Sequence, residues 1–177
     1  MKIFKNEKLF RMISSSILMI ALVLGCMGNQ YAKDIDKDLK EQKNDQTEEV
    51  KPSVVYSTHI QDIGWESDFS KKDGELAGTT GRCLRVEAMK IKLNNLANAS
   101  IKYQAHVQEI GWQDWVKDGE IAGTQGKCYR IEALKIKLEN AEKYSISYRA
   151  HIEDIGWQEW KNDGEIAGTT GQCKRIE

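Results

Sequence analysis

The chain has 177 residues, a formal net charge of -1 and a charged content of 30%. That length suits one domain with accessory segments, or an array of short repeats. A mean hydropathy of -0.58 excludes a multispan membrane protein. The lack of a basic excess argues against nucleic acid as a partner, and 4 cysteines are too few for a disulfide scaffold.

The first 26 residues have the pattern of a secretory signal peptide. Lysines and an arginine precede an apolar run from Met12 to Leu24. The run is about 13 residues long, whereas a transmembrane helix needs roughly 20. An uncleaved anchor that continues to Gly28 is the alternative.

The end of this segment, Val23-Leu24-Gly25-Cys26, resembles a bacterial lipobox. In such a motif a small residue precedes the cysteine whose thiol receives the lipid. We therefore predict that Cys26 is lipidated and holds an extracellular protein on the outer face of the cytoplasmic membrane. Ordinary cleavage, after Gly28 or Ala32, is the alternative and gives a secreted protein.

Residues 27–52 are expected to form a flexible charged tether. They mix acidic and basic residues with almost no large apolar side chains, so they cannot bury enough surface to offset the entropy of ordering. A short exposed helix from Ile35 to Lys43 is the alternative. The segment ends at Pro52, the only proline of the chain.

Three copies of one unit follow the tether. Residues 101–132 and 146–177 are identical at 21 of 32 positions without a gap, and residues 54–87 are a third copy with about two extra residues after Trp65. Cys83, Cys128 and Cys173 recur with a period of 45 residues. Such a period predicts a stacked or symmetric repeat architecture. We therefore assign residues 53–177 to one domain with repeat 1 (53–97), repeat 2 (98–142) and repeat 3 (143–177).

The local pattern of the repeats predicts β-strands. Apolar and polar residues alternate in residues 103–107 (YQAHV) and 134–138 (LKIKL), which is the period of a strand with one buried face. Ile131 and Ala133 are out of phase with Leu134, so we expect a bulge or corner near Ala133. No window has a sustained helical period. The repeats are therefore predicted to be all-β, with about four short strands each.

One strand of the set has no counterpart in repeat 3. Repeats 1 and 2 continue from Glu87 and Glu132 into AMKIKL and ALKIKL, whereas repeat 3 stops at Glu177. Three units of about 45 residues predict a pseudo-threefold closed domain, of the β-prism or β-trefoil type, in which the last repeat is truncated. An open row is the alternative, and its free strand edge would pair with a neighbour.

The repeat pattern resembles a known family. In repeat 2 it reads AHVxxIGWQxWxxDGExAGTxG, followed by RIEALKIKL. This pattern is similar to that of the clostridial hydrophobic repeats with a Gly-Trp signature, the ChW repeats, and the resemblance covers residues 54–177. It implies a secreted or cell-surface protein of clostridia or related Gram-positive bacteria. It also implies non-catalytic modules, with proposed roles in polysaccharide binding, adhesion or protein contacts.

The five tryptophans are the candidate ligand-binding residues. An exposed indole ring offers an apolar platform to the flat face of a sugar, whereas a buried one anchors a small β unit. We expect the tryptophan after Ile-Gly to lie mainly in the core (Trp65, Trp112 and Trp157). The second tryptophan, replaced by Phe69 in repeat 1, is the better candidate for exposure (Trp115 and Trp160). Nearby side chains that could bond sugar hydroxyls are Gln113, Asp118, Glu120 and Asn162.

Other repeated residues are interpreted as structural. The three histidines share one repeat position without a nucleophile beside them, so no enzyme activity is predicted. The Asp-Gly-Glu triplets lack the dense oxygen spacing of a calcium loop and are read as turns. The three repeat cysteines are expected to be small packed side chains. No metal or other cofactor is expected.

Two functions from different classes follow from these residues. The first is a non-catalytic surface module that binds polysaccharide or cell-wall glycan through exposed tryptophans. The second is a structural or adhesive module that contacts other surface proteins through β edges.

Overall fold

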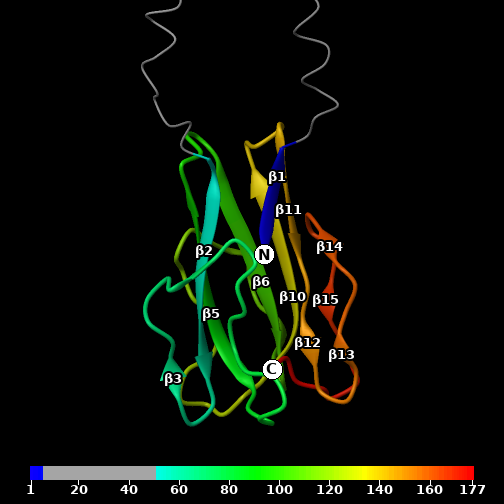
Figure 1. Cartoon of the computed structure of the whole chain (residues 1–177). Coiled ribbons are helices and arrows are strands. Elements are labelled where there is room, and N and C mark those ends of the chain that lie inside the picture. Colours follow the sequence, from blue (N-terminus) through cyan, green and yellow to red (C-terminus); the bar gives the residue numbers. More distant parts are fainter. Residues whose placement is uncertain (6–50) are drawn as a thin grey trace, which may run out of the picture. The chain divides into compact units, whose positions relative to one another are not determined.

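The computed structural model describes residues 1–5 and 51–177 (Figure 1). Within these ranges the chain forms strands and turns and no helix, as the alternating pattern predicts. The described part accordingly holds no helix able to cross a membrane. Cys26 and nearly all of the predicted tether fall outside the described residues.

Each repeat is built from long strands and two-residue strands. In repeat 1 the long strands are β2 (Ser53–Ile60) and β5 (Val86–Asn94), and the short ones are β3 (Gly64–Trp65) and β4 (Lys71–Lys72). In repeat 2 the long strands are β6 (Ser100–Val107) and β10 (Ile131–Glu139). Its short strands are β7 (Gly111–Trp112), β8 (Val116–Lys117) and β9 (Ala122–Gly123).

Repeat 3 follows the same order with a divided first strand. That strand is split into β11 (Tyr144–Tyr148) and β12 (His151–Ile152). The short strands are β13 (Gly156–Trp157), β14 (Lys161–Asn162) and β15 (Ala167–Gly168). The expectation of about four short strands in every repeat is therefore wrong in detail, because two strands in each of repeats 1 and 2 are long.

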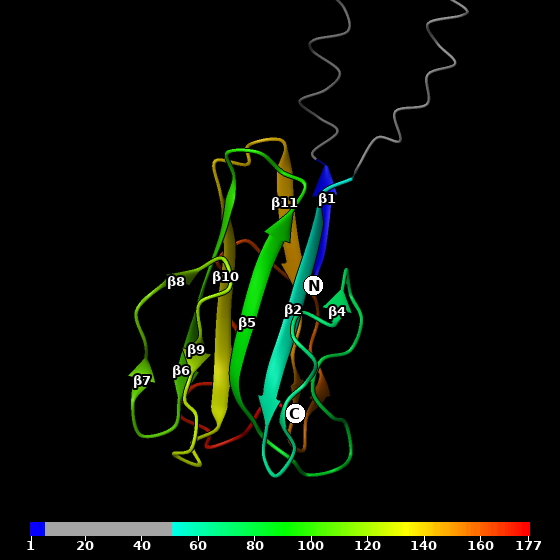
Figure 2. The same ribbon diagram turned by 90° about the vertical axis from the view of Figure 1, so that its left-hand side faces the viewer.

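The long strands of a repeat pair antiparallel. β2 pairs with β5, β6 pairs with β10, and the register of the second pair shifts between Ile131 and Ala133. This irregularity is the predicted bulge. Figure 2 shows β2 and β5 side by side and pointing in opposite directions, as the antiparallel pairing requires. The described strands form four sheets, and none of these closes into a barrel.

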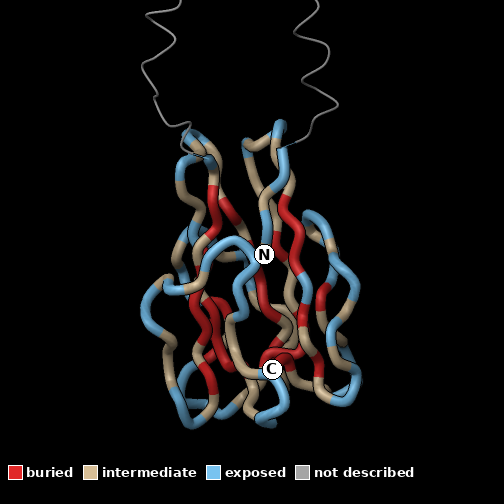
Figure 3. The backbone as a smooth tube through the Cα atoms, in the orientation of Figure 1, coloured by how far each residue is buried: buried red, intermediate tan, exposed pale blue. Residues whose placement is uncertain are grey.

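All three repeats contribute to a single hydrophobic core. Tyr103, Ala105 and Val107 are fully buried, as the alternation predicts, and they share one cluster with Tyr56 of repeat 1 and Tyr148 of repeat 3. Figure 3 shows the buried residues along the long strands and the exposed ones in the loops.

A short strand of each later repeat pairs with the long strand of the repeat before it. β9 of repeat 2 pairs with β5 of repeat 1, and β15 of repeat 3 pairs with β10 of repeat 2. At this contact Gly123 has φ +103, and a Cβ built on it would lie 2.3 Å from the Glu87 carbonyl oxygen. The Ala-Gly step of the repeat is therefore required for close approach between two backbones.

Buried tyrosines join the same neighbours. The Tyr103 hydroxyl accepts a hydrogen bond of 3.1 Å from the backbone N–H of Ile91 and donates one to the Glu120 carbonyl. The Tyr148 hydroxyl accepts one of 3.0 Å from the Ile136 N–H. Each tyrosine thus connects its own repeat to the long strand of the preceding repeat.

These tyrosines predict a loss of stability at alkaline pH. Burial raises the pKa of Tyr56, Tyr103 and Tyr148 to about 12, from an ordinary value of 10.0. The unfolded chain therefore ionises first, so the stabilisation is complete below pH 10 and is lost as the pH rises through 12. Urea midpoints measured between pH 9 and pH 12 should fall over this window. Tyr103→Phe should flatten the fall, and an unchanged slope in that variant would contradict the assignment.

The N-terminal residues belong to the same compact unit as the repeats. β1 (Lys2–Lys5) pairs antiparallel with β11 (Figure 1), placing Lys2 opposite Ser147 and Ile3 opposite Ile146. Ile3 packs against the core, whereas Phe4 is 51% exposed. A strand of the first residues therefore lies along the edge of repeat 3.

Candidate functional site

The tryptophans do not divide between core and surface as the sequence suggests. Trp65 and Trp112 are half-buried and lie outside the buried core, while Trp157 is 46% exposed. The expectation that these three are mainly core is therefore wrong. Trp115 and Trp160, the better candidates for exposure, are indeed exposed, by 38% and 39%.

The first tryptophan ring of each repeat contacts both a histidine ring and a cation. In repeat 2 the rings of His106 and Trp112 meet edge to face, with centroids 5.3 Å apart. The Lys135 Nζ lies 4.7 Å from the centroid of Trp112, within range of a cation–π interaction. β7 pairs with β6 in the register that places Trp112 opposite His106. The hairpin therefore fixes the pair of rings.

A buried carboxylate lies on the other side of the histidine. The Glu132 Oε2 is 3.1 Å from the Nδ1 of His106, and its Oε1 accepts a 2.8 Å hydrogen bond from Arg130. Only 7% of the Glu132 side chain is exposed, against 19% for Arg130. The Nδ1 of His106 makes no hydrogen bond. The hydrogen bonds of this carboxylate therefore come from the arginine.

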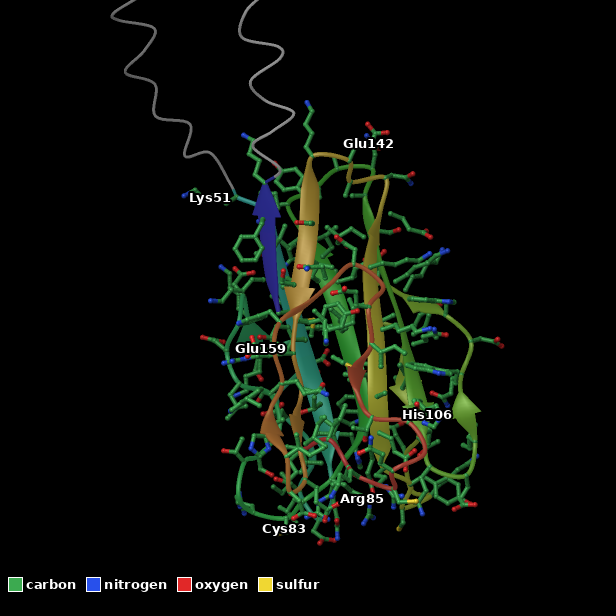
Figure 4. The ribbon with its side chains drawn as sticks, turned by 90° about the vertical axis from the view of Figure 1, so that its right-hand side faces the viewer. Lys51, Cys83, Arg85, His106, Glu142 and Glu159 are labelled. Atoms are coloured by element: carbon green, nitrogen blue, oxygen red, sulfur yellow. The ribbon has the colours of Figure 1, made fainter. Side chains whose placement is uncertain are left out.

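This cluster occurs three times. In repeat 1 it consists of His59, Glu87 and Arg85, and the distance from the histidine Nδ1 to the glutamate Oε2 is 3.2 Å. In repeat 3 it consists of His151, Glu177 and Arg175, and the same distance is 3.5 Å. Figure 4 places His106, Arg85 and Cys83 toward the end of the domain opposite Glu142. These clusters were not predicted from the sequence, although their signal is the Arg-x-Glu spacing that recurs in all three repeats.

The second tryptophan also carries a cation. The Lys137 Nζ is 4.9 Å from the centroid of Trp115, and the Arg149 guanidinium is 4.8 Å from that of Trp160. In repeat 1 the Lys90 Nζ lies 5.4 Å from the centroid of Phe69, although Lys90 is the counterpart of Lys135 rather than of Lys137, so Phe69 stands only roughly where these tryptophans stand. Each exposed tryptophan ring therefore has a cation within range of a cation–π interaction.

The polar residues suggested as hydroxyl ligands already have partners within the protein. The Gln113 carboxamide makes two hydrogen bonds to the backbone of Gly123, at 2.6 and 3.2 Å. Asp118 accepts from the Ile101 N–H, Glu120 from the Lys117 N–H, and Asn162 from the Ser147 hydroxyl. These side chains therefore shape the turns. The Asp-Gly-Glu triplets are confirmed as turns by the same bonds.

Exposed aliphatic residues recur at two positions beside these turns. One follows the hairpin residue with positive φ, and the other follows the Asp-Gly-Glu turn. Each is more than 40% exposed, and together they are Ile63, Ile110 and Ile155, then Leu76, Ile121 and Ile166. The same two turns of each repeat therefore carry exposed apolar side chains.

The repeat cysteines are at the surface. Cys83, Cys128 and Cys173 are free thiols, exposed, with φ of 55° to 57°. The expectation of small packed cysteines is therefore wrong, because the left-handed turn directs them out of the sheet. Among the described residues no group of three or more His, Cys, Asp or Glu side chains could hold a metal ion.

One of the comparisons with known proteins identifies a family. The family model described as Clostridial hydrophobic W (ChW) matches residues 59–95, 106–140 and 151–177, which together make up more than half of the chain. No curated protein and no solved structure matched in the corresponding comparisons. The three matches coincide with the three copies of the His, Trp and Glu cluster. The chain therefore belongs to the Clostridial hydrophobic W repeat family, a family of repeat modules rather than of enzymes.

Proposed function

We propose that the chain is a non-catalytic module of the bacterial surface that binds polysaccharide or cell-wall glycan through its tryptophans. The observation that carries this proposal is the exposure of Trp115, Trp157 and Trp160, none of which belongs to the buried core. An indole ring that is already oriented offers a sugar an apolar face at little entropic cost. Three repeats on one chain then engage a polymer together, so weak single sites give firm retention.

The proposed site in each repeat is the ring with its cation and the neighbouring exposed aliphatic residue. The polar groups around it are occupied in turns, so selectivity for hydroxyls comes from the cations over the rings rather than from Gln113 or Asn162. Lys137 and Arg149 supply these cations. Polymers with acidic groups are therefore the best first candidates among wall glycans.

Retention on a polysaccharide matrix tests this site. Trp115→Ala with Trp160→Ala should weaken retention by tenfold or more, and by far more than either change alone, because two of the linked sites are lost. The measurement is affinity electrophoresis or elution from cell-wall glycan. Trp115→Phe with Trp160→Phe is the matched control, since Phe69 already fills this position in repeat 1, and it should retain part of the binding. Full retention by a folded double alanine variant would remove the glycan proposal.

We further propose that the protein is exported and held on the membrane by a lipid on Cys26, a residue outside the described part of the chain. The support is the basic start, the short apolar run and the lipobox-like end of residues 1–26.

The anchor is tested by fractionation. Cys26→Ala should move most of the protein from the membrane fraction to the medium, because one or two acyl chains supply the attachment. Equal distribution of the parent and the variant would disprove the anchor. Glycan binding does not depend on this result.

A second candidate function is contact with other surface proteins through an open strand edge. It is favoured by one specific observation. β1 pairs with the edge of repeat 3 only from Tyr144 to Ser147, so the rest of this edge is left without a partner strand on that side.

A further inference from the structure

Three lysines of repeat 2 stand side by side across one sheet. Lys102 of β6 lies opposite Lys117 of β8 on one side and opposite Lys137 of β10 on the other. Residues that are directly opposite in antiparallel strands point to the same face of the sheet. Ile101 and Tyr103, the neighbours of Lys102 in its strand, are fully buried, so the three lysines lie on the outer face. We call Lys102, Lys117 and Lys137 the lysine row.

The positive charge of the lysine row is only partly balanced within the protein. The Glu139 carboxylate lies 3.0 Å from the Lys102 Nζ and 3.5 Å from the Lys137 Nζ. Lys117 is exposed and forms no ion pair with any residue that the structure describes. Like charges placed directly opposite one another destabilise a sheet. The row therefore has a surplus of positive charge that the fold itself does not use.

The carboxylates of the adjoining turn are committed elsewhere. Asp118 accepts a hydrogen bond from the Ile101 N–H, and Glu120 accepts one from the Lys117 N–H. Both carboxylates therefore hold the backbone of the turn. The side chains of Lys102 and Lys137 are 34% and 39% exposed, so a group in solution can reach them.

The other two repeats form the same strands without a complete lysine row. In repeat 1, Val55 is the central residue, between Lys72 and Lys92. In repeat 3, Ser147 is the central residue, and its hydroxyl donates a 2.7 Å hydrogen bond to the Asn162 side chain opposite. The strand pairing therefore does not require three lysines, and the row is a feature of repeat 2 alone.

The lysine row is continuous with an exposed tryptophan. The Lys137 Nζ lies 4.9 Å from the centroid of Trp115 and 3.5 Å from a Glu139 oxygen, so one lysine contacts both groups. The hydrogen bond and charge of Lys102 lower the pKa of Glu139 below its ordinary value of 4.5, which keeps this carboxylate ionised. The structure thus contains one example of an anion seated between two lysines of the row, beside an apolar ring.

We propose that the lysine row and Trp115 form the subsite of repeat 2 that binds an acidic group of a wall polysaccharide, a carboxylate or a phosphodiester. The sugar next to the acidic group lies on the Trp115 ring. The acidic group takes the place of the Glu139 carboxylate between Lys102 and Lys137, and it gains Lys117 as a further partner. Lysine ammonium groups act as point charges, so they suit either anion. This inference rests on the proposed function and names the class of polymer and the residues that select it.

Affinity electrophoresis of the full chain tests the subsite. The gels contain polygalacturonate, poly(glycerol phosphate) or neutral hydroxyethyl cellulose, and each variant is compared with its own mobility in a gel without polymer. Lys102→Gln with Lys117→Gln should weaken binding to an acidic polymer by fivefold or more and change binding to the neutral one by less than twofold. Lys72→Gln with Lys92→Gln is the matched control, because it removes the same charge from repeat 1. It should change acidic binding by less than twofold.

A third variant tests the subsite in the opposite direction. Glu139→Gln should strengthen binding to the same acidic polymer by twofold or more, because it removes the carboxylate that competes for Lys102 and Lys137. A gain of binding cannot come from loss of folding. The acidic polymer whose binding responds identifies the anion as carboxylate or phosphodiester.

Three outcomes would overturn the subsite. They are equal losses in the two lysine double variants, acidic binding that Lys102→Gln with Lys117→Gln leaves unchanged, and a parent that binds neither acidic polymer. Retention of the tryptophan variants on cell-wall glycan decides the proposed function separately, since a polymer held by the rings alone would still be retained.

Discussion

Gly123→Ala is expected to lower the free energy of unfolding by about 3 kcal/mol or more. The new Cβ would lie 2.3 Å from the Glu87 carbonyl oxygen and 2.7 Å from the Ala88 Cα. Both atoms belong to the backbone of β5, which is fixed by its pairing with β2, so neither can move aside cheaply. The φ of +103 adds strain for any side chain. Urea denaturation measures the loss.

Gly126→Ala is the matched control for this substitution. Gly126 also has a positive φ, +67, but nothing lies within 4 Å of its Cβ position. Only the left-handed conformation is penalised there, at about 1 kcal/mol. Equal losses in the two variants would show that the conformation, rather than the close approach of repeat 2 to repeat 1, is the cause. Gly168→Ala should reproduce the larger loss, because its Cβ would lie 2.3 Å from the Glu132 carbonyl oxygen.

Arg130→Met is expected to destabilise the fold by about 3 kcal/mol. The substitution keeps most of the side-chain volume but leaves the Glu132 carboxylate, 7% exposed, without the two hydrogen bonds from the guanidinium. His106 remains at 3.1 Å, without an aligned bond. Because a buried charge without a partner costs more than the pair contributes, the effect is larger than that of losing a surface ion pair.

A double variant shows whether the loss comes from an unpaired buried charge or from lost packing of the arginine stem. Arg130→Met combined with Glu132→Gln removes the buried charge together with its partner, and it should recover about 1–2 kcal/mol relative to Arg130→Met alone. A simple sum of the two single losses would mean that the arginine acts through packing of its stem instead. Chemical denaturation of the parent, of Arg130→Met, of Glu132→Gln and of the double variant at one pH gives the coupling energy between the two residues.

Much of the fold follows from short patterns in the repeats. The alternation in residues 103–107 predicts the buried face of β6, because a two-residue period leaves only one way to bury Tyr103, Ala105 and Val107. The break in phase at Ala133 predicts the bulge for the same reason. The Asp-Gly-Glu turns follow from local chemistry, since Glu120 accepts a hydrogen bond from the Lys117 N–H three residues before it.

The burial of the tryptophans could not be predicted in this way. Trp112 and Trp157 share a repeat position and nearly all of their local sequence, yet Trp157 is the more exposed. The two rings differ in the residue that lies over them. Lys135 of the long strand β10 lies over Trp112, whereas Arg149, which belongs to no strand, lies over Trp157. Contacts of this kind join residues far apart in the chain, and local pattern carries no information about them.

The position of β1 was also beyond local pattern. Residues 2–5 read KIFK, which alternates like a strand, but their basic and apolar character is equally that of the start of a signal peptide. Pairing with β11 decides the conformation in the structure. The cysteines were misassigned for a related reason, because the left-handed turn that exposes Cys128 is set by backbone geometry rather than by the hydrophobicity of the thiol.

The pairing of a short strand with the preceding repeat has a consequence for the cooperativity of unfolding. Because β9 completes the sheet of repeat 1 and β15 completes that of repeat 2, neither of these two repeats contains all the strands of its own sheet. Unfolding of repeat 2 removes β9 from its predecessor and at the same time deprives β15 of its partner. The three repeats therefore melt as a single thermodynamic unit, unlike an extended array in which terminal repeats fray independently.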